Sequence, residues 1–269
     1  MTFEQIGFVL IPPLLLIISG MIASSHPPSM GVRIGILHFA AGVVLAVVAV
    51  ELLPDLRHEH EVIHSGVGFA LGVIAMFTVR YFTEHKEEEE AAGATHTAHD
   101  SPEPHDAHAS AANAAPVTSK TAPLSALPSS MVAAIVVDLA IDGLMIGIGF
   151  AAGAHQGRLL AIALSTELLS LGLALGATMF TRKVSKGRAF RMLALLPVGF
   201  IIGAGLGLSL LRHLSPPWLS FVLSFGAAAL LFLVTEELLI EAHKEKETAW
   251  MTAMFFVGFF LMMMLGLLE

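Results

Sequence analysis

The stretch "VAVELLPDLRHEHE" at residues 48–61 recurs in altered form as "VTEELLIEAHKEKE" at residues 234–247. Aligned without gaps, the two segments pair Glu51 with Glu237. The match extends upstream, because Phe39 and Phe225 each lie twelve residues before those glutamates. Apolar segments resemble one another by composition, so the carboxylate at the same depth is the informative feature. We interpret the pair as an internal repeat, with chance similarity between two apolar helices as the alternative.

The composition indicates a membrane protein. Hydrophobic residues make up 55% of the 269 residues and charged residues only 13%, and the mean hydropathy is +0.79. Soluble domains carry about 25% charged residues. Apolar runs of about 20 residues predict membrane spans, which must be helices because the bilayer core offers the backbone no hydrogen-bond partner. Eight such runs occur, at residues 4–24, 33–54, 64–83, 129–153, 157–181, 190–211, 217–241 and 249–268. The predicted fold class is therefore an all-α polytopic membrane protein with eight transmembrane helices.

Two further features limit the chemistry and the processing of the chain. It has no cysteine, which excludes disulfides and thiolate metal ligands. The N-terminal residues Met1 to Glu4 include an acid and no basic residue, which makes a poor signal peptide. We therefore expect the first span to stay in the protein.

Basic residues predict how the spans are oriented. The loops after the first, third, fifth and seventh spans hold most of the 14 lysine and arginine residues, whereas the other loops hold only Arg57, Arg158 and Arg212. Because basic loops face the cytoplasm, both termini are expected outside and the long connection after the third span is expected in the cytoplasm. The second and seventh spans then run in opposite directions. The repeat is thus an inverted one, as in many transporters.

The long connection at residues 84–128 differs from the rest of the chain in composition. It is rich in Ala, Ser, Thr, Pro and acidic residues, and it has no Phe, Tyr or Trp. We expect it to be disordered because it cannot bury a core. Its histidines include His96, His99, His105 and His108. Histidines beside acids bind transition metals weakly, so the loop is predicted to capture or sense metal, with a solvated linker as the alternative.

Ionisable side chains at membrane depth are costly and mark candidate functional sites. Those of this chain are carboxylates: Glu51 in the second span, Asp138 and Asp142 in the fourth, Glu167 in the fifth, and Glu236 and Glu237 in the seventh. The histidines His38, His155 and His213 are expected at span ends. A metal site inside the membrane is therefore expected to use oxygen ligands.

The fourth and fifth spans carry the densest group of these side chains. Asp138 and Asp142 are four residues apart and share one face of a helix. Two like charges at that distance repel unless a proton or a cation neutralises them. The fifth span adds Glu167, Thr166 and Ser170, and the short connection predicts an antiparallel hairpin that brings them to the aspartates. Such an oxygen-rich site suits Mg, Mn, Fe or Zn; carboxyl groups that hydrogen-bond between helices are the alternative.

The chain resembles the ZIP family of divalent metal transporters. The segments "FAAGVVLAVVAVELLPD" in the second span and "FLVTEELLIEA" in the seventh are similar to that family, as are the eight spans and the His-rich loop. In the fourth span "DLAIDG" stands where the family has a motif like H-N-x-P-E-G, so Asp138 takes the place of the His and Asp142 that of the acid. In the fifth span "TELLS" stands at a motif like H/Q-E/D-x-P-E/H. Glu167 keeps the second acid, while Thr166 and Ser170 replace stronger ligands.

The chain also departs from the family pattern. Leu139 and Ile141 replace the Asn and the Pro of the fourth-span motif, and Phe200 stands where the family often has a sixth-span carboxylate. The resemblance therefore implies one metal site, built on the three carboxylates of the fourth and fifth spans. The loss of histidine ligands favours harder ions than zinc.

The resemblance further implies two inverted three-helix repeats around a central two-helix element. The expected units are residues 1–83 with three spans, the loop 84–128, residues 129–181 with the central spans and the metal site, and residues 182–269 with the last three spans. Glu51 and Glu237 would be symmetry mates beside the metal path. Glu236, Asp55 and His38 are further candidates along it.

The predicted function is transmembrane transport of divalent metal cations, zinc or else manganese or iron, into the cytoplasm. One alternative is a family member that has lost transport and acts as a metal sensor or regulator. The other is an intramembrane metal-dependent hydrolase, which would need histidines near Asp138. The metal ion is the substrate; neither enzymatic activity nor an organic cofactor is expected. The expected partners are metal ions, the lipid bilayer and a second copy in a homodimer, with no nucleic acid, and the expected location is a bacterial inner (plasma) membrane.

Overall fold

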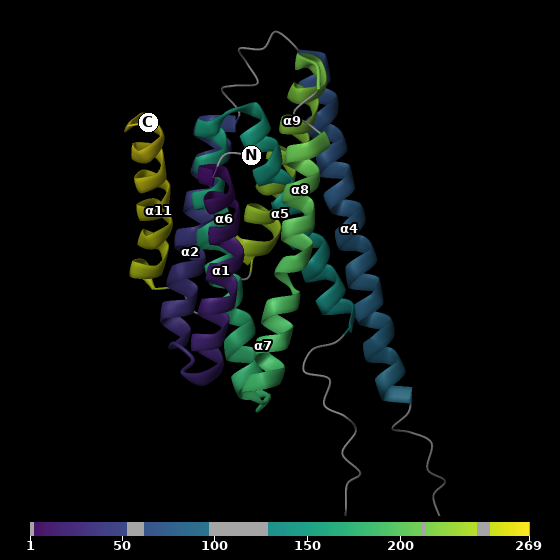
Figure 1. Cartoon of the computed structure of the whole chain (residues 1–269). Coiled ribbons are helices and arrows are strands. Elements are labelled where there is room, and N and C mark those ends of the chain that lie inside the picture. Colours follow the sequence, from purple (N-terminus) through teal and green to yellow (C-terminus); the bar gives the residue numbers. More distant parts are fainter. Residues whose placement is uncertain (1–2, 53–61, 97–128, 211–213, 241–247, 269) are drawn as a thin grey trace, which may run out of the picture.

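The computed structural model describes residues 3–52, 62–96, 129–210, 214–240 and 248–268, and these form a bundle of long helices with no strand among them (Figure 1). The first part comprises α1 (Phe3–Ser25), α2 (Met30–Ala46), its π-helical continuation η1 (Val47–Leu52), and α4 (Val62–His96). The central part comprises α5 (Ser129–Ala152) and α6 (Ala154–Thr181). The last part comprises α7 (Lys186–Leu195), α8 (Pro197–Leu210), α9 (Pro216–Leu233), its π-helical continuation η3 (Val234–Leu238), and α11 (Ala249–Leu268).

The helices confirm the predicted fold class. Within the described residues, seven helical spans are long and apolar enough to cross a membrane, and Val62–Thr78 of α4 provides a shorter apolar one. Large apolar side chains such as Ile22, Ile63 and Phe260 are exposed on the outside of the bundle. The chain is therefore an all-α polytopic membrane protein with eight transmembrane helices.

Two spans differ from the predicted segments. The sequence predicts a loop from residue 84, but α4 continues to His96, because the Glu, Lys and Ala residues that follow its apolar part are strong helix formers. Residues 84–96 are therefore helical, and the remainder of the predicted loop lies outside the described residues. The sixth span is divided into α7 and α8 beside Pro197, because proline lacks the N–H that continues a helix.

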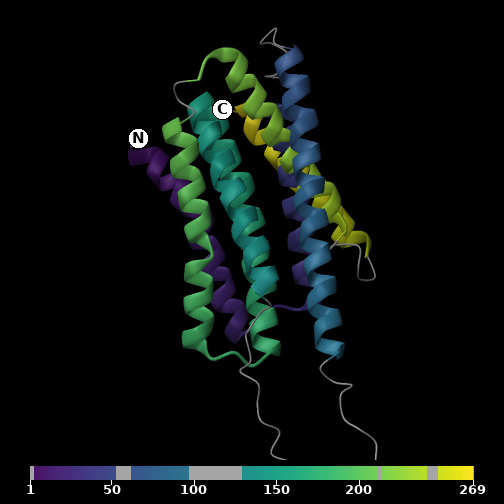
Figure 2. The same cartoon turned by 90° about the vertical axis from the view of Figure 1, so that its right-hand side faces the viewer.

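Helix pairing shows the symmetry of the fold. Among the described elements, the most extensive packing joins α1 to α6, α5 to α8, α2 to α11, and α4 to α9. The first three spans correspond in order to the last three, and α5 corresponds to α6. The α1–α6 pair is then equivalent to the α8–α5 pair, and the α2–α11 pair is equivalent to the α9–α4 pair. The bundle is thus built as two three-helix repeats around a central two-helix element (Figures 1 and 2).

Glycines fix the register of these pairs because they let helix backbones approach closely. A Cβ atom added at Gly258 of α11 would overlap the carbonyl oxygen of Phe39 in α2. One added at Gly72 of α4 would overlap the carbonyl oxygen of Phe225 in α9. Phe225 and Gly258 follow Phe39 and Gly72 by the same 186 positions, which is also the offset of the two repeated segments in the sequence. The helix contacts therefore follow the alignment predicted from the sequence.

The π-helical segments follow the same repeat. η1 ends the second span and contains Glu51, and η3 continues the seventh and contains Glu237. A π-helical turn within an α-helix is rare and is frequently found at functional sites. Hydrophobic periodicity does not reveal such turns, and the sequence did not predict them.

The hairpin of α5 and α6 occupies the centre of the bundle. In the apolar window of α6, 67% of the residues are buried, against 17% for α11 at the periphery. The two central helices are separated by Gly153 and run antiparallel (Figure 1). The N- and C-terminal ends of the chain lie at one end of the bundle, and α7 begins at the opposite end (Figures 1 and 2).

Candidate metal site

Three carboxylates meet between α5 and α6. One side-chain oxygen each from Asp138, Asp142 and Glu167 lies within 4.8 Å of the other two. Asp142 and Glu167 are only 2% and 6% exposed, and Asp138 is partly buried. The two aspartates are one helical turn apart on α5, and Glu167 comes from the antiparallel partner helix. The structure therefore brings together the three carboxylates that the sequence predicts as metal ligands.

Close helix packing holds the cluster in place. A Cβ atom added at Gly143 would overlap the carbonyl oxygen of Phe200 in α8, and one added at Gly172 would overlap α1. Asp138 and Glu167 each lie five residues before one of these glycines. The two carboxylates therefore occupy equivalent positions in the two central helices, each of which packs against a different repeat.

The structure separates the two hydroxyl side chains that were predicted as further ligands. Ser170 is 7% exposed and lines the same pocket as Glu167. Thr166 does not line this pocket, and its hydroxyl donates a hydrogen bond of 2.7 Å to the carbonyl oxygen of Ala163 in its own helix. Of the two, Ser170 is the one that lies beside the carboxylates.

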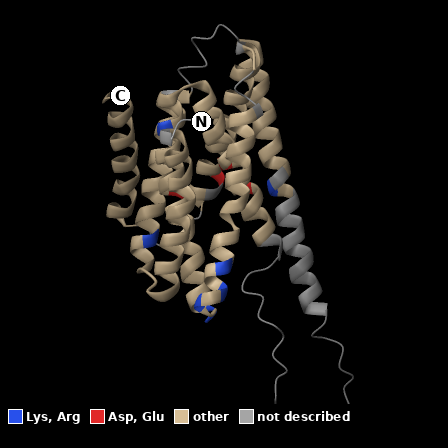
Figure 3. Cartoon of the chain, viewed as in Figure 1, with Lys and Arg blue, Asp and Glu red and all other residues tan. Residues whose placement is uncertain are grey.

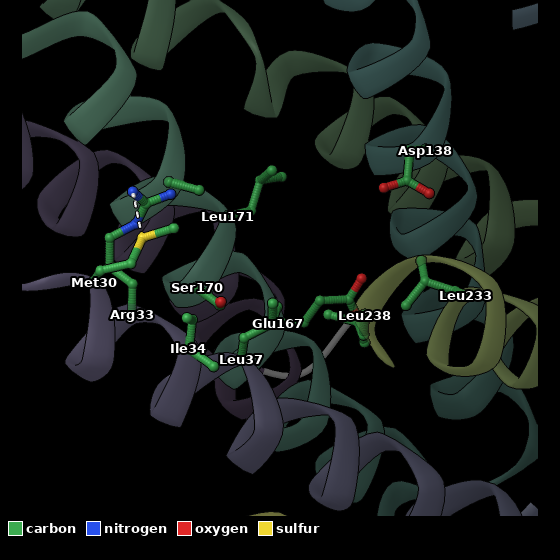
Figure 4. Close-up of a pocket in the computed structure, with 11 residues that line it drawn as sticks. Met30, Arg33, Ile34, Leu37, Asp138, Glu167, Ser170, Leu171, Leu233 and Leu238 are labelled. Carbon is green, nitrogen blue, oxygen red and sulfur yellow. Dashed lines mark hydrogen bonds between the residues drawn. The ribbon is translucent and has the colours of Figure 1, made fainter. Parts of the chain in front are cut away.

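A pocket of about 140 Å³ leads from the carboxylates toward the surface (Figure 4). Met30 is 48% exposed, so the pocket reaches the surface where α2 begins. Its wall is mainly apolar and comes from four spans: Met30, Arg33, Ile34 and Leu37 of α2; Asp138 of α5; Glu167, Ser170, Leu171 and Ala174 of α6; and Leu233 and Leu238 of α9 and η3.

The cluster lies midway along the bundle. Figure 3 shows the described acidic residues near one level, whereas many of the basic residues gather toward the end where α7 begins. Because apolar helices surround the cluster, its charges interact more strongly than they would in water. Carboxylate and hydroxyl oxygens are the ligands that hard divalent cations prefer. The arrangement can therefore hold a divalent cation inside the membrane.

Two residues predicted along the pathway, Glu236 and His38, do not line this pocket. Glu236 forms an ion pair with Arg80 of α4, and these side chains are 36% and 37% exposed. The sequence analysis expected His38 at a span end, and this was wrong: the side chain is buried inside the Met30–Val50 span. Its Nδ1 donates a hydrogen bond of 2.9 Å to the carbonyl oxygen of Ile34.

Other predicted residues lie beyond what the structure describes. The backbones of Glu51 and Glu237 belong to η1 and η3, and that of His96 ends α4, but their side chains are outside the described part. Asp55, His99, His105 and His108 are outside the described residues altogether.

Sequence reasoning missed the contribution of α2 to the pocket. Met30, Arg33, Ile34 and Leu37 line it together, and their spacing is that of one helical face. Arg33 entered the sequence analysis only as a marker of membrane orientation. An arginine on the same helical face as apolar residues was the signal that it points into the protein rather than into solvent.

Inverted repeats around a buried polar site are typical of membrane transporters. The comparison with protein families agrees with this class: residues 80–266 match the family model described as ZIP Zinc transporter. The chain therefore belongs to the ZIP family, a family of divalent metal transporters, as its motifs suggested. No curated protein matches the chain.

Proposed function

We propose that the protein carries divalent metal ions across the membrane through one site formed by Asp138, Asp142 and Glu167, with Ser170 beside them. The observation that supports this most is the meeting of three carboxylate oxygens within 4.8 Å between two buried helices. Like charges held so close in a low-dielectric environment repel one another, and a divalent cation removes that repulsion. The ion would exchange part of its hydration shell for these oxygens.

The donors favour a hard or borderline ion. No histidine lines the pocket among the described residues, and the sequence contains no cysteine. Manganese and iron therefore fit the donors at least as well as zinc does. The ion is the substrate, and neither an organic cofactor nor a nucleic acid takes part in the proposed function.

The proposed route is alternating access around this site. Both termini would face outside, and the end of the bundle where α2 and α7 begin would face the cytoplasm, because the basic residues gather there. In this structure the pocket leads toward that end, so ions would leave into the cytoplasm. The α5–α6 element would then move against the two repeats to open the site to the other side.

The remaining predicted residues have secondary roles in this proposal. Glu51 in η1 and Glu237 in η3 would pass ions or protons along the path, together with Glu236, Asp55 and His38. The loop histidines His96, His99, His105 and His108 would capture metal on the cytoplasmic side. The protein would act in a bacterial inner membrane as a homodimer.

Ion flux into proteoliposomes tests the proposed function. Zinc, manganese, iron, cadmium and magnesium are compared for the unchanged protein, for Asp138→Ala/Asp142→Ala, and for Ser209→Ala as a matched control. Ser209 is exposed on α8 and does not line the pocket. We expect flux of at least one ion, lost to the level of empty liposomes in the double variant and kept in the control. Flux that survives in the double variant would overturn the site. A folded protein that binds metal without flux would instead support the sensor alternative.

A further inference from the structure

A positive charge shares the pocket with the carboxylates. Arg33, in the first turn of α2, lines the same pocket as Asp138 and Glu167. Figure 4 shows Arg33 and Met30 at one side of the pocket and Asp138 at the other. An arginine side chain keeps its charge at all physiological pH values. A divalent cation that moves between the carboxylates and the surface near Met30 must therefore pass a fixed positive charge.

The polar contacts of Arg33 are weak. Its Nη1 lies 3.9 Å from the Sδ atom of Met30, and a thioether sulfur is a poor acceptor. Its Nε is buried and has no hydrogen-bond partner among the described residues. The Nε–H donor of Arg33 is therefore not used in this arrangement. Burial of an arginine donor without a partner is unfavourable. We therefore infer that Arg33 has a function in the pocket.

We propose that Arg33 is a tethered cation that competes with the metal ion for the carboxylates and so promotes release of the ion through this pocket. The proposal rests on the proposed transport function. While a divalent ion is bound, Arg33 repels it and lowers the affinity of the site. Once the ion leaves, the guanidinium group compensates part of the negative charge of Asp138 and Glu167. The empty site then keeps a positive charge in the same pocket as Asp138 and Glu167.

The test separates metal affinity from turnover. Arg33→Gln removes the charge and keeps a polar side chain, Arg33→Lys restores the charge, and Arg191→Gln is the matched control. Arg191 is exposed on α7 and does not line the pocket. Binding of Mn²⁺ and Zn²⁺ to the purified proteins gives the Kd, and initial rates in proteoliposomes give KM and kcat.

We expect Arg33→Gln to bind the transported ion about tenfold more tightly, with a lower KM and a lower kcat, because release becomes slow. Electrostatic repulsion by one unit charge in a protein interior is large enough for a change of this size. Arg33→Lys should return both constants toward those of the unchanged protein, and Arg191→Gln should not change them. A loss of folding would lower kcat without tightening binding, so the Kd distinguishes the two causes.

The failure of this inference is distinguishable from that of the proposed function. If the unchanged protein transports metal but Arg33→Gln has the same or a weaker affinity, the role of Arg33 is overturned and the transport site is not. If the unchanged protein neither binds nor transports any ion, the proposed function itself is overturned, and the inference with it.

Discussion

At the scale of single residues, the candidate ligands of the fourth and fifth spans differ in their surroundings. Three carboxylates converge, but the two neighbouring hydroxyl groups have different surroundings. Thr166 donates its hydrogen bond to its own helix, and Ser170 faces the pocket. A position in a motif therefore does not decide which oxygen an ion would meet, because a hydroxyl side chain on a helix can bond to a carbonyl of the preceding turn instead.

This difference predicts unequal effects of two mutations. Ser170→Ala should raise the Kd or KM for the transported ion about two- to tenfold, since a neutral polar contact contributes about 0.5–1.5 kcal/mol. Thr166→Val, which keeps the side-chain volume, should leave both constants unchanged. Metal binding and flux assays on the two variants provide the measurement. Equal effects of the two substitutions would show that Thr166 also contacts the ion.

At the scale of helices, glycine contacts decide how close the elements come. Gly258 and Gly72 support equivalent contacts in the two repeats, and Gly143 and Gly172 do so for the two central helices. Small residues have this role in membranes because the lipid provides no hydrophobic driving force for helix association, so close packing must supply it.

We therefore expect Gly258→Ala to destabilise the bundle by about 1–3 kcal/mol, the usual cost of overpacking, since its Cβ would overlap the backbone of Phe39. Gly205→Ala in α8 is the control because a Cβ atom there meets nothing within 4 Å. Its stability should stay the same or rise slightly, because alanine is the better helix former. Thermal unfolding in detergent compares the two. Similar melting temperatures would contradict the contact.

At the scale of the whole molecule, the two repeats are similar but not equivalent. The repeat offset pairs Arg80 with Gly266 and Glu236 with Val50. The Arg80–Glu236 ion pair, which joins α4 to η3, thus has glycine and valine at the matching positions of the other repeat. Half-exposed ion pairs contribute at most about 1 kcal/mol, so this one adds little stability, but it links α4 to η3 by a contact that the other repeat lacks.

The orientation of the bundle can be tested by labelling, because the chain has no cysteine of its own. Lys186→Cys, at the start of α7, and Ser215→Cys, at the start of α9, place single thiols at exposed positions on either side of the sixth span. With both termini outside, a membrane-impermeant maleimide should label position 186 only from the cytoplasmic side and position 215 only from the outside. The reverse pattern would overturn the proposed orientation and with it the direction of ion release.

Several features of this protein followed from its sequence alone: the membrane class, the eight spans, the inverted repeat and the three carboxylates of the central helices. They could be predicted because hydropathy, helical spacing and internal similarity are properties of the chain itself. The helical extension of α4 to His96 was missed because its composition is shared by helices and by disordered acidic segments.

Only the tertiary structure decided which side chains share the site. Arg33 of α2 and Leu238 of η3 line one pocket with Asp138 and Glu167. Each of the two lies more than seventy positions along the chain from the nearer of these carboxylates. The tertiary structure also places Ser170, but not Thr166, at the pocket. It pairs Glu236 with Arg80 of α4. These facts depend on how helices pack against one another, and that packing is set by contacts between residues that the sequence does not place side by side.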